Sequence, residues 1–182
     1  MYQWTLKKEI ALHVFVSLLF FLPFVFIHHL VGQNVALLYA GVLVGVFLPD
    51  IDHLIYTLFL KPSEITSQRV RSKVASKNFA SAIDLLFSTR DERKNLIFHN
   101  FLFQALFVVF SFLVVSSTTS LFGRGVVISF LLSLLVDESL DMYFRADFSR
   151  WLRGLPMSLT SQQLRLYLGV QGFLIFVLGY LF

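Results

Sequence analysis

Long runs of apolar residues, separated by shorter polar segments, give this sequence five stretches of the length that a membrane-spanning helix needs. A helix rises about 1.5 Å per residue, so about 20 apolar residues cross the hydrocarbon core of a bilayer. The pattern therefore predicts an all-α membrane bundle with spans at residues 10–31, 35–60, 95–116, 125–144 and 166–182. The last run is about 25 Å long as a helix, so its crossing is marginal.

Two polar segments, 61–94 and 145–165, interrupt these runs. In the first, apolar residues at helical spacing oppose a basic side, which predicts one amphipathic helix lying at the membrane interface. Its apolar positions are Val70, Val74, Phe79, Ile83, Leu86 and Phe87. No internal repeat divides the sequence, and we expect a single membrane domain over residues 1–182.

The ends of two helices also carry local signals. The four residues from Thr89 to Glu92 have the pattern of a capping box, which predicts that the third spanning helix begins near Arg90. Residues 160–163 predict a cap for the last helix. Trp151 lies among basic residues, as is typical of a side chain in the headgroup region.

Composition and charge agree with a membrane protein. Hydrophobic residues make up 57% of the chain and the mean hydropathy is +0.75, which excludes an ordinary soluble domain. The absence of cysteine excludes disulfides, thiolate metal sites and cysteine nucleophiles. With the amino terminus in the cytoplasm, 14 of the 15 Lys and Arg residues fall inside, and only Arg124 falls outside. This asymmetry predicts an N-in chain with five spans.

The net charge of +4 is thereby explained as a topology signal, and we expect no nucleic-acid partner. The basic cytoplasmic segments instead predict contact with anionic lipid headgroups. The sequence does not indicate a partner protein.

Ionisable residues inside the apolar runs are the main indication of function, because each costs about 2.5 to 3.5 kcal/mol at the bilayer centre. They form four groups, all in the cytoplasmic half of the bilayer in the predicted orientation. The groups are His13; Asp50, Asp52 and His53; His99; and Asp137, Glu138 and Asp141. If the helices bundle, these side chains meet in one pocket. Imidazoles together with carboxylates predict one or two divalent metal ions, with zinc, manganese or iron favoured over magnesium or calcium.

Helical offsets support such a site. Asp137 and Asp141 are four residues apart, so they share a helix face and can approach the same ion. Asp52 lies on the opposite side of an ideal helix from Asp50, and the two converge only if the chain bends. Pro49 removes a backbone donor and predicts a break there. The candidate metal ligands are His13, Asp50, Asp52, His53, His99, Asp137 and Asp141, and the candidate bridging ligands or general bases are Asp50, Asp137 and Glu138.

The string Leu48-Pro49-Asp50-Ile51-Asp52-His53, together with the flanking histidines, resembles a bacterial family of small inner-membrane metal-dependent hydrolases. That family includes a LexA-regulated membrane-bound hydrolase, and its motifs are distantly similar in style to zinc-dependent phospholipase C. The resemblance runs from about His13 to Asp141. It implies a metal-dependent hydrolase of a bacterial or archaeal cytoplasmic membrane. The matching positions are His13, Asp50, Asp52, His53, His99 and Asp141.

The chain departs from the family pattern at two places. Asp137 stands where the family has a histidine. The stretch from Lys94 to Asn100 keeps only the second histidine of the family's corresponding motif and lacks its first histidine, arginine, threonine and serine.

Three functions fit these observations. The first is a membrane-embedded metal-dependent hydrolase, open to the cytoplasmic leaflet, that acts on a lipid or other amphiphilic phosphoester. The metal would lower the pKa of a bound water and polarise the ester. The second is a divalent-cation or proton-coupled transporter, although the outer halves of the runs are almost wholly apolar, which favours the hydrolase. The third is a noncatalytic scaffold in which a metal staples the helices.

Overall fold

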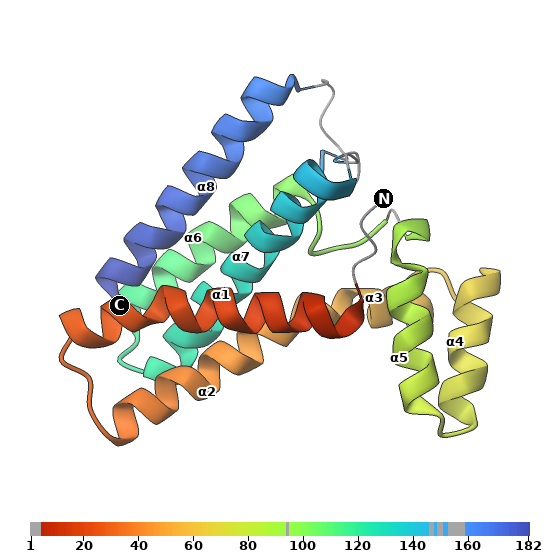
Figure 1. Cartoon of the computed structure of the whole chain (residues 1–182), viewed down its shortest axis with the longest axis horizontal. Coiled ribbons are helices and arrows are strands. Elements are labelled where there is room, and N and C mark those ends of the chain that lie inside the picture. The colour runs from red at the N-terminus through yellow and green to blue at the C-terminus, as the bar shows by residue number, and fades with distance from the viewer. Residues whose placement is uncertain (1–4, 94, 146–147, 149–150, 153–158) are drawn as a thin grey trace.

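The computed structural model describes residues 5–93, 95–145, 148, 151–152 and 159–182, and within these it contains eight α-helices and no strand (Figure 1). The all-α prediction is confirmed. The helices are α1 (Leu6–Ile27), α2 (Gln33–Phe47), α3 (Ile51–Ile55), α4 (Ile65–Ala75), α5 (Phe79–Ser88), α6 (Phe101–Ser117), α7 (Leu121–Leu140) and α8 (Ser161–Leu181). Short π-helical turns follow α3 and α7, at Tyr56–Leu60 and Asp141–Arg145, and a 3-10 turn covers Arg90–Glu92.

Two of these helices, α1 and α8, are long and apolar enough to cross a membrane. Helix α2 and the helical stretch from Ile51 to Leu60 add a third crossing if they form one broken span, which bends by 41°. Helix α6 has 17 residues, and α7 carries Arg124, Asp137 and Glu138. Length and composition therefore support two or three crossings in the described part of the chain, and the five predicted spans stay a prediction.

The bend between α2 and α3 falls at residues 48–50, where the sequence predicts a break at Pro49. Proline has no backbone N–H and its ring clashes with the preceding turn, so a straight helix is disfavoured there. The predicted break is confirmed.

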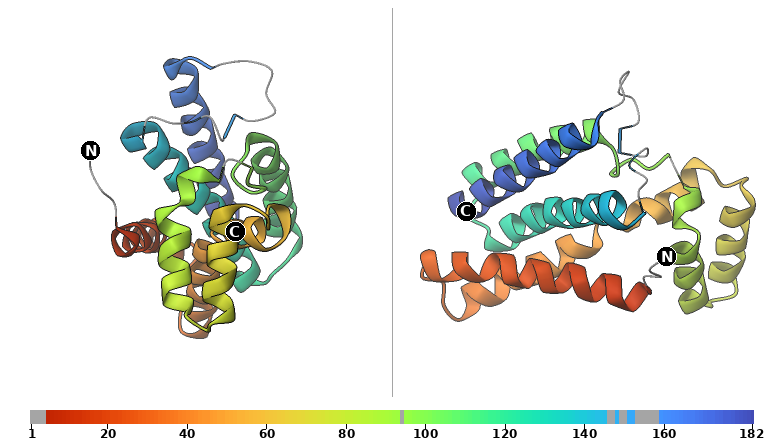
Figure 2. Two further views of the ribbon diagram at one scale, coloured as in Figure 1. Left: turned by 90° about the vertical axis from the view of Figure 1, so that its right-hand side faces the viewer. Right: turned by 45° about the horizontal axis from the view of Figure 1, so that its top comes forward.

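Helix α7 is the centre of the bundle, and α1, α2, α6 and α8 pack around it (Figure 2). Its closest neighbour is α2, because glycines let the two backbones touch. A Cβ atom added to Gly41 would lie 2.1 Å from the Phe122 carbonyl oxygen, and one added to Gly45 would lie 2.3 Å from the Val126 oxygen. Small residues four apart allow this close packing of membrane helices.

The main apolar core fills the end of the bundle that holds the α1–α2 connection and the end of α8. Its members include Phe21, Phe24, Leu38, Val42, Ile128, Leu131, Ile175 and Leu178. The polar residues singled out by the sequence lie toward the other end of the same helices, near α3 and the α4–α5 pair. The bundle thus has an apolar end and a polar end.

Residues 61–94 do not form the single amphipathic helix that the apolar spacing predicts. They form α4 and α5, which pack side by side at one end of the molecule (Figure 1). The chain turns at Lys77, whose φ is +58°, and the Asn78 side chain caps α5 by accepting from the Ser81 backbone N–H. The prediction was wrong because side-chain spacing does not record a left-handed backbone at one lysine.

The third predicted spanning helix also begins later than expected. Residues 90–92 form the 3-10 turn, and α6 begins only at Phe101, with the Asn100 side chain accepting from the Phe103 N–H at 2.9 Å. Asn100 is therefore the cap, and the predicted start near Arg90 is wrong. The cap of the last helix is confirmed, since Thr160 and Gln163 form a reciprocal capping box. Residues 146–147, 149–150 and 153–158, about half of the predicted cytoplasmic segment 145–165, lie outside the described residues, as do residues 1–4 and 94.

Candidate metal centre

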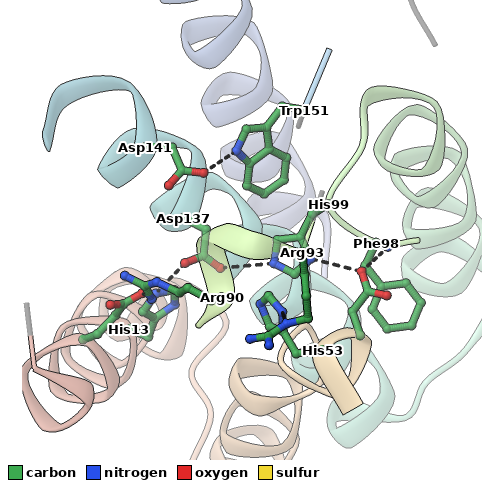
Figure 3. Close-up of polar contacts among 11 residues, drawn as sticks. His13, His53, Arg90, Arg93, Phe98, His99, Asp137, Asp141 and Trp151 are labelled. Atoms are coloured by element: carbon green, nitrogen blue, oxygen red, sulfur yellow. Dashed lines mark hydrogen bonds and ion pairs between the residues drawn. The ribbon is translucent and has the colours of Figure 1, made fainter. Parts of the chain in front are cut away.

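Four polar side chains from four parts of the chain meet at the polar end of the bundle (Figure 3). His13 Nε2 of α1 lies 3.4 Å from Asp137 Oδ1 of α7. The other Asp137 oxygen lies 3.8 Å from Nε2 of His99, which belongs to the segment before α6. The Nδ1 atom of His99 lies 3.1 Å from Asp52 Oδ2 of α3. All four side chains are buried. The structure therefore brings together one residue from each of the four groups that the sequence predicts.

Asp52 is fully buried and supports this arrangement through both of its oxygens. They accept the backbone N–H groups of Ile97 and Phe98, at 2.9 and 2.6 Å, in addition to the contact with His99. The carboxylate thus ties α3 to the segment that carries His99. A carboxylate on one ring nitrogen fixes the orientation of the other nitrogen, which here lies toward Asp137.

Glu9 completes a group that could hold a metal ion. One ligand atom each of Glu9, His13 and Asp137 lie within 4.8 Å of one another, and all three residues are buried. Two carboxylates and one imidazole suit a divalent metal with mixed nitrogen and oxygen ligands. Glu9 is not among the residues predicted from the sequence, because it precedes the apolar run, although Glu9 and His13 are four residues apart and share a face of α1.

A small cavity of about 30 Å³ adjoins this group, lined by Glu9, His13, Asp50 and Asp137 among others. A space needs only about 10 to 15 Å³ on this measure to hold a water-sized species. The residues present therefore fit a metal ion both in donor type and in the room beside them.

Two arginines, counted only as topology signals in the sequence, belong to the same region. Arg90 forms an ion pair with Glu9 and lies 4.4 Å from the centre of the Phe87 ring. Arg93 is 1% exposed, and its Nε donates to His53 Nδ1 at 3.0 Å. No local pattern could have placed them here, because they lie 81 and 40 residues from their partners.

His53 is held by this arginine. Its Nδ1 accepts a hydrogen bond from the Arg93 Nε–H, so that nitrogen is not available to a metal in this arrangement. The ring lies 5.3 Å from the His99 ring. Asp50, three residues earlier, is exposed and lines the small cavity.

Asp141 is not brought to the metal-binding group. Its Oδ2 accepts from Trp151 Nε1 at 2.6 Å, and Figure 3 shows this pair apart from the contacts of Asp137. The Asp141 N–H bonds to the Asp137 carbonyl oxygen, so the two residues keep the spacing of one α-helical turn, and the π-helical turn begins only at Asp141. It is the bond to Trp151 that occupies the Asp141 carboxylate. Trp151 is only 1% exposed, so it is a buried partner of this carboxylate and not the expected headgroup anchor.

Glu138 also lies away from the group, although it is adjacent to Asp137. It is fully buried, and its Oε1 accepts from the Tyr167 hydroxyl at 3.0 Å. Successive side chains on a helix point about 100° apart, which sends Asp137 toward α1 and Glu138 toward α8.

A larger cavity of about 520 Å³ lies beside the metal-binding group, between α1, the α2–α3 bend and α5. Its polar lining is Glu9, Asp50, His53, Arg90, His99 and Asp137. The rest of its wall is apolar and includes Phe47, Leu54, Phe79, Ile83 and Leu86. The volume is in the range of small-molecule sites, which combine apolar walls with a few convergent polar groups.

Comparison of the chain with family models, curated proteins and solved structures finds no match.

Proposed function

We propose that this protein is a membrane-embedded metal-dependent hydrolase that acts on a lipid or another amphiphilic phosphoester. The observation that carries the proposal is the position of Glu9, His13 and Asp137, a group able to hold a metal ion, at the polar end of a largely apolar cavity. A molecule with a charged ester and an apolar tail matches both parts of that cavity. The motif resemblance around Pro49 supports the same class of enzyme.

The ligand set proposed for the metal is Glu9, His13 and Asp137, with His99 beside Asp137. Three protein ligands are the number that catalytic zinc sites use, and mixed nitrogen and oxygen donors favour zinc or manganese. A bound metal would supply a water of lowered pKa and a positive charge next to the phosphoryl oxygens. Asp52 is proposed as the positioning residue of His99, since its oxygens are occupied by backbone donors.

The chain's own residues provide the remaining chemistry. Arg90 lies at the cavity wall, and a guanidinium has five N–H donors, so it can bind phosphate oxygens beside its pair with Glu9. Asp50 lines the same cavity outside the three-residue group and is the proposed general base. In the reaction, the water oxygen attacks phosphorus and the bond from phosphorus to the lipid oxygen breaks. The proton removed by Asp50 returns to that leaving oxygen.

The α4–α5 pair suits the entry of an amphiphile. Helix α4 carries exposed Arg69 and Arg71, which would attract anionic headgroups. On α5, Phe79 and Ile83 are 58% and 51% exposed and also line the cavity. Charge on one helix and an apolar path on the next are the features that a lateral lipid entrance requires.

The metal and the activity can be tested on the purified protein in detergent. We expect elemental analysis to find one or two transition-metal ions per chain, and Asp137→Asn and His13→Gln to lose them together with hydrolysis of phospholipid in mixed micelles. Asp84→Asn is the matched control, because Asp84 is an exposed acid of α5 outside the cavity. A metal-free protein, or full lipid turnover by Asp137→Asn, would refute the proposal.

We also propose the N-in orientation with five spans in a bacterial or archaeal cytoplasmic membrane. The natural chain has no cysteine, so a single introduced cysteine is the one thiol that can react, and its labelling shows on which side of the membrane that position lies. We expect Thr119→Cys, between α6 and α7, to react with a membrane-impermeant maleimide on intact cells. Lys77→Cys, in the α4–α5 turn, should react only after permeabilisation. The reverse pattern would invert the topology.

A noncatalytic scaffold is the second candidate, favoured by one observation. The contacts from His13 through Asp137 and His99 to Asp52 already join α1, α7, the segment before α6 and α3. If this is their whole role, removing the metal will melt the protein, and no phosphoester will be hydrolysed by the metal-loaded form.

A further inference from the structure

A second polar cluster lies between α6, α7 and α8, away from the metal centre. The Tyr167 hydroxyl, which donates to Glu138 Oε1 at 3.0 Å, also contacts the side-chain amide of Gln104. Gln171 Nε2 donates to Gln104 Oε1 at 3.1 Å. Gln104, Glu138 and Gln171 are 2%, 0% and 5% exposed, so this is a buried polar site inside an apolar bundle.

The hydrogen bonds of the two amides are incomplete. The Nε2 donor of Gln104 and the Oε1 acceptor of Gln171 have no hydrogen-bond partner, and neither has Oε2 of the neighbouring Glu138. Exchanging nitrogen and oxygen in both amides leaves the same balance of one unpaired donor and one unpaired acceptor. Buried amide groups normally find partners, and a bilayer core offers no water to provide them. An occupant that completes both amides must therefore accept one hydrogen bond and donate another.

These amides line a groove of about 300 Å³ between α6 and α8. Apart from Tyr167, its other walls are Phe101, Ala105, Val108, Val170 and Leu174. Ala105 and Val170 are exposed, so the groove lies on the outer surface of these two helices, where a bilayer would supply its contents. Gln104 and Gln171 thus stand in the wall of an otherwise largely apolar groove.

From this arrangement we propose that the α6–α8 groove binds a membrane-soluble alcohol. Its hydroxyl group accepts a hydrogen bond from one amide and donates a hydrogen bond to the other. Its hydrocarbon chain lies along Val108 and Leu174. A hydroxyl is the smallest lipid group that provides both a donor and an acceptor. An ester or an ether provides only acceptors and would leave one amide unpaired.

Photocrosslinking in phospholipid nanodiscs tests this proposal with two matched probes. One is a long-chain alcohol that carries a diazirine, and the other is its methyl ether. We expect the alcohol to label peptides of α6 and α8 about tenfold more than the ether does, because the ether leaves a buried polar group without a partner. An excess of unlabelled alcohol should abolish the labelling. Equal labelling by both probes would mean nonspecific lipid contact and would overturn the proposal.

Three variants locate the site. Ala105→Phe fills the groove without removing a polar group, and Gln171→Met removes one amide; both should lose the preference for the alcohol. Val109→Phe is the matched control, since Val109 is 59% exposed on the same helix and does not line the groove. Circular dichroism and the unfolding temperature check that each variant is folded. If Ala105→Phe is folded and still labelled like the natural chain, the proposal is wrong. Metal content is measured in parallel, so a failure here is separate from a failure of the proposed hydrolase.

Discussion

The contact between α2 and α7 leads to a prediction about how the bundle holds its metal centre. Replacing Gly45 by alanine would put a Cβ atom 2.3 Å from the Val126 carbonyl oxygen and 2.0 Å from Ser129 Oγ. Ordinary contact begins near 3.4 Å, so the two backbones must separate by about 1 Å even if the serine side chain rotates away. Overpacking of this kind costs about 1 to 3 kcal/mol of unfolding free energy.

Gly169→Ala in α8 is the matched control, because a Cβ atom there meets nothing within 4 Å. Alanine is the better helix former, so this variant should be unchanged or more stable by up to about 1 kcal/mol. The two substitutions are chemically identical and differ only in their surroundings. Any difference between them therefore measures the helix contact and not the intrinsic preference of alanine.

Separating α2 from α7 should also displace residues of the metal centre, since α2 leads into the bend before Asp52 and α7 carries Asp137. We expect Gly45→Ala to bind metal more weakly than Gly169→Ala does, as well as unfolding at a lower temperature. Both are measured on purified protein in detergent, by thermal unfolding followed by circular dichroism and by metal titration. If Gly45→Ala is at least as stable as Gly169→Ala, the close contact of α2 and α7 is not as the structure has it.

Three further predictions concern single groups. Asp52→Asn replaces an acceptor by a donor that faces a backbone N–H of Ile97 or Phe98. We expect it to lower the unfolding free energy by about 1 to 3 kcal/mol and to weaken metal binding about 10- to 100-fold. Unchanged metal affinity would show that Asp52 does not support the metal centre. Trp151→Phe removes the indole donor from the buried carboxylate of Asp141. We expect the unfolding free energy to fall by about 1 to 3 kcal/mol, measured as a lower unfolding temperature. An unchanged unfolding temperature would show that this hydrogen bond is not made. Chelation should lower the unfolding temperature of the metal-loaded protein, since a metal present at 100 times its Kd stabilises the folded state by about 2.7 kcal/mol. The Asp137→Asn variant should show no such shift. An equal shift in both proteins would mean that the metal binds at another site.

The helical class, the break at Pro49 and the cap of the last helix are predicted from the sequence because local chemistry controls them. An apolar segment in a bilayer must satisfy its backbone within itself, so long apolar runs become helices. The break at Pro49 and the cap at Thr160 follow from the groups that those residues lack or provide. The turn at Lys77 was not predicted, since a lysine carries no sequence signal for positive φ.

The meeting of His13, Asp52, His99 and Asp137 is also predicted in outline. Each would be costly alone in an apolar environment, so their occurrence at one end of several helices indicates that they partner one another. Which atoms meet is a different question. The sequence does not distinguish Asp52, held by backbone donors, from Asp137, which lies between two histidines.

Residue patterns along the chain are therefore enough to predict that it is helical, apolar enough for a membrane and polar at one end of its helices. They do not predict that Glu9 belongs to the metal-binding group, that Arg90 pairs with Glu9, or that Glu138 lies in a cluster separate from Asp137. Such pairings depend on the rotation and spacing of helices far apart in the chain. Those quantities follow from how side chains and glycines pack across the bundle, which no local pattern of residues records.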